Sequence, residues 1–145
     1  MSTEIFSFVV TPTDPQVPLN LSVWINQECV WDSLPIDQKT VFSQEIPDDQ
    51  EQEYCVKITM SGKTDQHTTI DEQGNIIKDA LLTFGQFELM GIDISNIVEN
   101  NARYRHNHNG HSDEIDQHFA MSMGCNGTVE IRFTAPMYLW LLEYL

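Results

Sequence analysis

The chain has 145 residues, of which 41% are apolar, and its 22 Asp and Glu outnumber its 7 Lys and Arg to give a formal net charge of −15. This length and composition fit one globular domain over residues 1–145 and exclude wholesale disorder. A surface this acidic repels nucleic-acid phosphates and anionic membranes, so it favours basic partners, cations or simple solubility.

The N-terminal segment has neither the basic nor the apolar region of a signal peptide. We therefore expect synthesis and assembly in a cytoplasm. Cys29, Cys55 and Cys125 are odd in number and far apart, which argues against a disulfide framework. Cys29 and Cys55 lie in apolar runs and are expected to be buried.

Strand patterns dominate the first half of the chain. Residues 5–10 form an apolar run that ends in a proline-rich break. Residues 19–26 alternate apolar and polar side chains, and a tight turn leads into residues 29–31, which predicts a hairpin. Residues 41–46 and 54–60 are two further strand candidates, separated by an acidic loop.

The second half continues the strand pattern. Residues 80–89 need a bulge or kink at Gly85, because the apolar positions change phase there. Residues 92–97 and 128–134 also alternate. The sequence thus predicts an all-β fold with little helix, a two-sheet antiparallel β-sandwich of jelly-roll or Ig-like type, with a closed barrel as the alternative. The expected core residues are Val23, Ile25, Val56, Ile58, Val129, Ile131 and Phe133.

A polar segment at residues 65–79 is rich in oxygen ligands. Calcium takes such carboxylate and amide oxygens from flexible loops. The alternative is a β-hairpin whose turn uses residues 72–75, and the spacing departs from that of an EF-hand. The candidate calcium ligands are Asp65, Asp71, Asn75 and Asp79.

A histidine-rich segment follows at residues 103–118. On a strand, His106 and His108 would share a face, and a turn at Gly110 could bring back His111. Together with nearby carboxylates these imidazoles suit zinc or nickel, which would make a metal-dependent enzyme the third functional class. The segment is polar throughout and lacks the H-E-x-x-H pattern, which favours a solvated loop.

Trp24 lies on the polar side of its strand, beside Asn20, Ser22 and Asn26. An exposed indole among amides offers an apolar face to a sugar ring and partners to its hydroxyls. Trp24 and Trp31 are therefore candidate carbohydrate-binding residues. The alternative is that a loop or a neighbouring subunit covers this face.

The last nine residues, 137–145, carry one charged side chain and can be read as a strand or a short helix. As a strand, Tyr138, Trp140 and Leu142 would share one face, with both faces largely apolar. A small sandwich cannot bury both faces of a strand at its end. We therefore expect one face to pack on the core and the other, with Tyr138, Trp140 and Leu142 as interface candidates, to contact a partner chain.

Two parts of the chain carry a resemblance to a known family. They are residues 61–68 continuing to 79–82, SGKTDQHT and DALL, and residues 123–129 through 136–143, MGCNGTV and PMYLWLLE. Together they resemble small proteins encoded by tailed bacteriophages, notably those of marine cyanobacteria. The layout is also similar to that of calcium-dependent carbohydrate-binding modules of jelly-roll type.

The resemblance implies a phage origin and a place in the virion, and it brings no catalytic residue. A capsid decoration or a tail or baseplate accessory would be a non-enzymatic structural component. It would act through contacts with other virion proteins or with itself, without nucleic-acid or membrane partners. The alternative is a carbohydrate-binding module that attaches the particle to host glycan, with calcium assisting.

Overall fold

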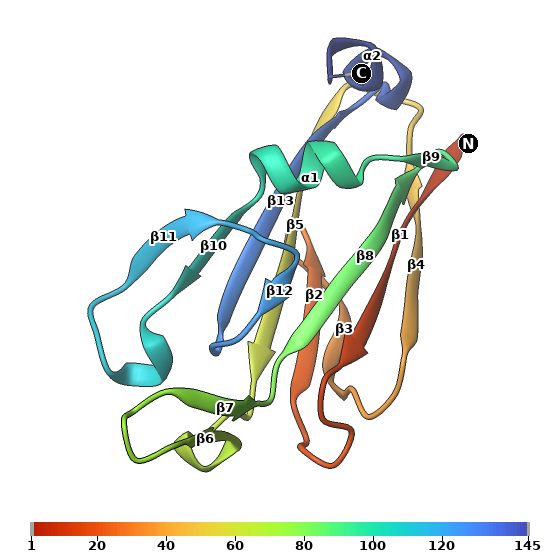
Figure 1. The fold of residues 1–145 in the computed structure, drawn as a ribbon. Helices are drawn as coiled ribbons and strands as arrows, with labels where there is room; N and C mark the ends of the chain where they lie inside the picture. The colour runs from red at the N-terminus through yellow and green to blue at the C-terminus, as the bar shows by residue number, and fades with distance from the viewer. Residues whose placement is uncertain (1, 145) are drawn as a thin grey trace.

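The structure, a computed structural model, describes residues 2–144 as strands joined by short turns, with two short helices (Figure 1). The helices are α1 (Ser95–Asn101) and α2 (Met137–Tyr144), with 3-10 turns η1 (Asp65–His67) and η2 (His108–Gly110). The strands are β1 (Thr3–Pro12), β2 (Asn20–Ile25), β3 (Glu28–Pro35), β4 (Thr40–Pro47), β5 (Gln52–Ser61), β6 (Thr68–Ile70), β7 (Ile76–Asp79), β8 (Leu82–Leu89), β9 (Ile92–Asp93), β10 (Arg103–His106), β11 (Ile115–His118), β12 (Ser122–Met123) and β13 (Gly127–Ala135).

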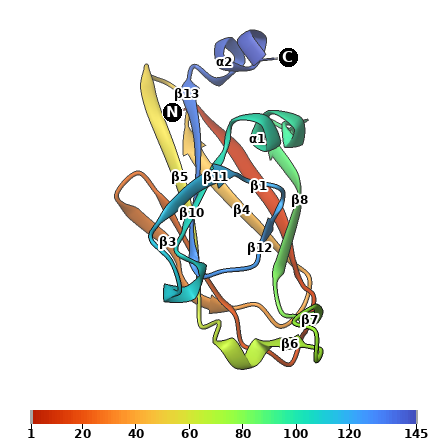
Figure 2. The ribbon, with the colours of Figure 1, turned by 60° about the vertical axis from the view of Figure 1, so that its left-hand side comes forward.

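Two antiparallel sheets pack face to face. The five-stranded sheet has the order β12-β8-β1-β4, with β9 paired to β8. The six-stranded sheet has the order β11-β10-β13-β5-β2-β3. Figure 2 shows the two layers, with β1 and β8 in one and β5 and β13 in the other. The predicted two-sheet β-sandwich is therefore confirmed.

The core lies between the sheets and follows from the period of two along each strand. In β5, for example, Val56 and Ile58 point inward while Lys57 points out. Phenylalanines fill the centre, with the rings of Phe8 and Phe42 stacked 4.9 Å apart. All seven predicted core residues are buried: Val23, Ile25, Val56, Ile58, Val129, Ile131 and Phe133.

The predicted bulge is present and lies directly after Gly85, which is still paired with Val9. The register between β1 and β8 shifts there, where β8 has one residue more than β1. Gln86 takes the left-handed conformation at this point, with φ of 52°. Because the extra residue changes which side faces inward, Phe84 and Phe87 are both buried although they lie three positions apart.

The strand predicted at residues 92–97 is wrong over most of its length. β9 ends at Asp93, and α1 begins two residues later. Ile94, Ile97 and Val98 are all buried, and their spacing of three and four residues is that of one helical face. An alternation this short does not distinguish a period of two from one of 3.6.

The C-terminal tail is the helix α2, so the grouping of Tyr138, Trp140 and Leu142 on one strand face is wrong. Met137, Trp140 and Leu141 are buried, whereas Tyr138 and Leu142 are exposed. The expectation that one side packs on the core is met by the helix, and contact of the other side with a partner stays a prediction. Among residues 2–144, the helices are too short or too polar to cross a membrane.

The two ends of the sandwich carry different features. α2 lies at one end, and the hairpin of β6 and β7 projects from the other (Figures 1 and 2). The connection between β10 and β11, which contains η2, lies near the hairpin end. The histidine segment and the polar segment at residues 65–79 are thereby brought to the same end of the molecule.

Candidate functional site

The outward side chains of the six-stranded sheet form rows across neighbouring strands. Trp24 on β2 lies opposite Lys57 on β5, and Lys57 lies opposite Glu130 on β13. In the next row, Thr59 lies opposite Thr128. These positions alternate with the buried ones, so the pattern that builds the core also gathers the polar groups on one face.

A groove of about 670 Å³ crosses this face from Trp24 to the segment after β10. Its surface combines one indole with amide, hydroxyl and charged side chains. Arg105 Nη1 donates to Glu130 Oε1 at 2.7 Å, and the hydroxyls of Thr59 and Thr128 are hydrogen-bonded at 3.0 Å. A groove of this size with both donors and acceptors lies in the range of small-ligand sites.

The two tryptophans of the first hairpin have different surroundings. Trp24 is 40% exposed and lines the groove. Trp31 packs edge-on against Phe42, with ring centroids 4.9 Å apart. It also packs edge-on against Phe8, with ring centroids 6.4 Å apart. Of the two carbohydrate-binding candidates, Trp24 lines the groove, whereas the ring of Trp31 packs against the core.

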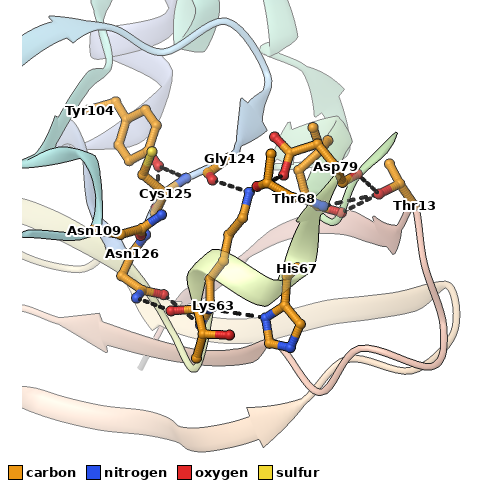
Figure 3. A network of polar contacts seen from close by, with 12 residues as sticks. Thr13, Lys63, His67, Thr68, Asp79, Tyr104, Asn109, Gly124, Cys125 and Asn126 are labelled. Carbon is orange, nitrogen blue, oxygen red and sulfur yellow. Dashed lines mark hydrogen bonds and ion pairs between the residues drawn. The ribbon is translucent and has the colours of Figure 1, made fainter. Parts of the chain in front are cut away.

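Lys63 fixes the segment of residues 65–79 to the sandwich (Figure 3). Its side chain is buried, and Nζ donates to Asp79 Oδ1 and to the carbonyl oxygen of Gly124, each at 2.5 Å. Thr68 Oγ1 donates to the same Asp79 oxygen at 2.7 Å. The carboxylate of Asp79, a candidate calcium ligand, is therefore engaged by an ammonium and a hydroxyl.

The other candidate calcium ligands lie in separate sets of contacts. Asp71 Oδ1 accepts the backbone N–H of Asn75 at 2.9 Å, and this bond is the main cause of the lowered pKa of Asp71. Asp65 is paired with His111 at 2.8 Å. Among residues 2–144, groups of three or more His, Cys, Asp or Glu side chains placed around one metal position are absent.

We expect the melting temperature to be the same in millimolar calcium and in chelator at equal ionic strength. The reason is that Asp71 is held by its own turn and Asp79 by Lys63. Differential scanning fluorimetry measures this directly, since a cation that binds only the folded state raises the melting temperature. A clear rise with calcium would restore the calcium site predicted from the sequence.

The histidine segment is divided between different partners. The ring centroids of His106 and His108 lie 4.7 Å apart. The two do not share a strand face as predicted, because β10 ends at His106 and His108 begins η2. His111, by contrast, bonds to Asp65, and Asp116 is bound by the two arginines of β10. The side chains of this segment therefore bond to different partners and do not converge on one point.

His106 gives the fold a pH dependence. It is buried, and burial, followed by the charge of His108, lowers its pKa. The unfolded chain then binds this proton more readily, so stability is full above about pH 6.5 and falls as the pH drops through that value toward the folded pKa. We expect His106→Gln to reduce the loss of melting temperature between about pH 7 and pH 5. The exposed His118→Gln should keep the wild-type slope, and equal slopes in all three proteins would contradict this role of His106.

No family model, curated protein or solved structure matches this chain. Two features of the site were not predicted from the sequence: the buried Lys63 and the ion pair of Arg105 with Glu130. The second left a signal, because Arg103 and Arg105 stand two positions apart and so share one face of a strand. The burial of Lys63 left no signal in the sequence, because its partners, Asp79 and Gly124, come from distant segments.

Proposed function

We propose that this chain is a non-enzymatic β-sandwich that binds a glycan in the groove beside Trp24. One observation carries the proposal: an indole that is 40% exposed stands at the edge of a groove otherwise lined by polar side chains. Large exposed aromatics commonly mark a contact surface. The groove follows the sheet face, so several of its groups come from rigid strands.

A sugar ring suits this mixture of groups. Its C–H face is apolar and packs on an indole, while its hydroxyls both donate and accept hydrogen bonds. The amides of Asn26 and Gln27 lie on the Trp24 side, and Arg105 and Glu130 lie across the groove. Donors and acceptors therefore flank the aromatic platform on the same face.

We expect Trp24→Ala to lose binding on a glycan array by about tenfold or more, a loss of about 1.4 kcal/mol or more. Trp24→Phe should retain part of the signal, because a smaller aromatic face remains. Leu34→Ala is the matched control, since Leu34 is 37% exposed on β3 and lies outside the groove. Wild-type binding that Trp24→Ala leaves intact, or a wild-type protein that binds no glycan, would refute the proposal.

A second proposal is that the chain is a component of a phage particle that docks on another protein or on itself through α2. The phage resemblance supports it, and so does the exposed side of the helix, where Leu139 is 49% and Leu142 is 72% exposed. Such a row of apolar side chains is costly to leave in water. Trp24 and the exposed side chains of α2 belong to different parts of the molecule, so the two proposals are compatible.

We expect Leu142→Lys to abolish assembly without lowering the melting temperature, because a cation near a helix C-terminus is favourable. Light scattering of the purified protein and proteomics of the particle measure the two forms of assembly. Ile77→Lys, at an equally exposed position on β7, should leave assembly unchanged. A monomeric wild-type protein that is also absent from the particle would contradict the docking role.

A further inference from the structure

A second cavity lies between the two helices and the six-stranded sheet. It encloses about 320 Å³ and is lined on one side by apolar groups of α1 and α2, among them Val98, Trp140 and Tyr144. The ring of Trp140 packs there against the rings of Phe133 and Tyr144, with centroid distances of 6.0 Å and 5.0 Å. One wall of the cavity is thus apolar and fixed by aromatic packing.

The other wall is charged, with three cations and the carboxylate of Glu130. The chain has three arginines, Arg103, Arg105 and Arg132, and all three line this one cavity. They do so in a chain of formal net charge −15. Arginine presents planar, paired donors that match the two oxygens of a carboxylate. The convergence of every guanidinium on a single cavity is the observation that calls for a ligand.

The ion pairs at this wall leave most of the guanidinium donors open. Each guanidinium has five N–H donors. Arg103 uses two of them on Asp116, and Arg105 uses one on Asp116 and one on Glu130. Arg132 makes a single long bond of 3.4 Å to Glu130 and its side chain is 70% exposed. Arg132 is therefore the group best able to turn toward an incoming anion.

We infer that this cavity binds a small monocarboxylate with an apolar body. The carboxylate would take the open donors of Arg132 and its neighbours, and the body would lie against Trp140 and α1. The volume is at the small end of the range for ligand sites, which suits one ring or a short alkyl chain. An inorganic anion would leave the apolar wall unused, and a neutral apolar molecule would leave the arginines unused.

This site is distinct from the glycan groove, although the pair of Arg105 and Glu130 lines both. Of these two sites, Trp24 lines only the groove, and Arg132 and Trp140 line only the cavity. Variants at Trp24 and at Arg132 therefore test the two sites separately, and either proposal can fail while the other stands.

The test is titration of the full chain with phenylacetate, followed by the indole N–H resonance of Trp140 in heteronuclear NMR. Trp140→Phe assigns that resonance. We expect a saturable shift with phenylacetate, a loss of affinity of about tenfold in Arg132→Gln, and a smaller loss in Arg132→Lys. Trp24→Ala should bind phenylacetate like the wild type.

Phenylacetamide and inorganic phosphate are the matched probes, because each keeps one half of the ligand. Both should bind at least about tenfold more weakly than phenylacetate. Equal binding of phenylacetamide, unchanged affinity in Arg132→Gln, or a Trp140 resonance that does not move up to about 10 mM phenylacetate would overturn the inference.

Discussion

Ending the chain at Pro136 is expected to leave it largely unfolded at room temperature, although only a short helix is removed. Met137, Trp140 and Leu141 of α2 are buried. Burial of such side chains contributes about 2 kcal/mol each, so their joint loss approaches about 6 kcal/mol. The total stability of a domain is roughly 5–15 kcal/mol. Circular dichroism with urea titration measures the loss.

Point variants separate the buried side of α2 from the exposed one. Leu141→Ala should cost about 2–4 kcal/mol, because Leu141 is 3% exposed. Leu142→Ala should stay within about 0.5 kcal/mol, because Leu142 is 72% exposed. Equal effects of the two substitutions, or a truncated chain that unfolds at the wild-type urea concentration, would show that α2 does not complete the core.

The strands were predictable because each one buries one face, which leaves a period of two in the sequence. β5 and β13 are clear examples, with inward and outward residues alternating along almost their whole length. α1 was missed because a helix of seven residues leaves a short pattern: Ile94, just before the helix, is followed by Ile97 and Val98 at spacings of three and four. α2 was ambiguous because apolar side chains occupy nearly every position of the tail.

The candidate site was predictable in part. Trp24 could be found, since an aromatic at a polar position of an alternating strand must face outward. The far side of the groove could not be predicted. Arg105 and Glu130 lie on the same sheet face as Trp24 only because of the order and register of β10, β13, β5 and β2. The arginine cavity also needs the position of both helices. Strand order and helix packing are long-range properties that a local pattern does not encode.

Replacing Lys63 is expected to have the second large effect, and the reason lies in what its ammonium joins. Nζ bonds to Asp79 at the end of the β6–β7 hairpin and to the carbonyl of Gly124. The backbone of Lys63 is held separately by two bonds with the side chain of Asn126, at 3.0 and 2.9 Å. A side-chain substitution therefore removes the ion pair while the backbone bonds remain.

Lys63→Met should lower the free energy of unfolding by about 2–3 kcal/mol, because it removes a buried ammonium from a carboxylate and a carbonyl that both depend on it. The matched control is Lys78→Met. Lys78 pairs with Asp14 at 3.1 Å but is 67% exposed, and exposed pairs contribute about 0–1 kcal/mol. The same methionine is introduced in both variants, so the difference in urea-derived free energy reports burial of the lysine.

Hydrogen exchange should locate the effect of Lys63→Met. Thr68 and Ala80 bracket the hairpin, and the backbone N–H of Ala80 donates to the carbonyl of His67 at 3.0 Å. Without the ammonium we expect this amide and those paired between β6 and β7 to exchange faster, while amides of β5 and β13 change only by the global loss of stability. A Lys63→Met protein as stable as Lys78→Met, with the hairpin amides still protected, would show that the buried ion pair does not hold the hairpin on the sandwich.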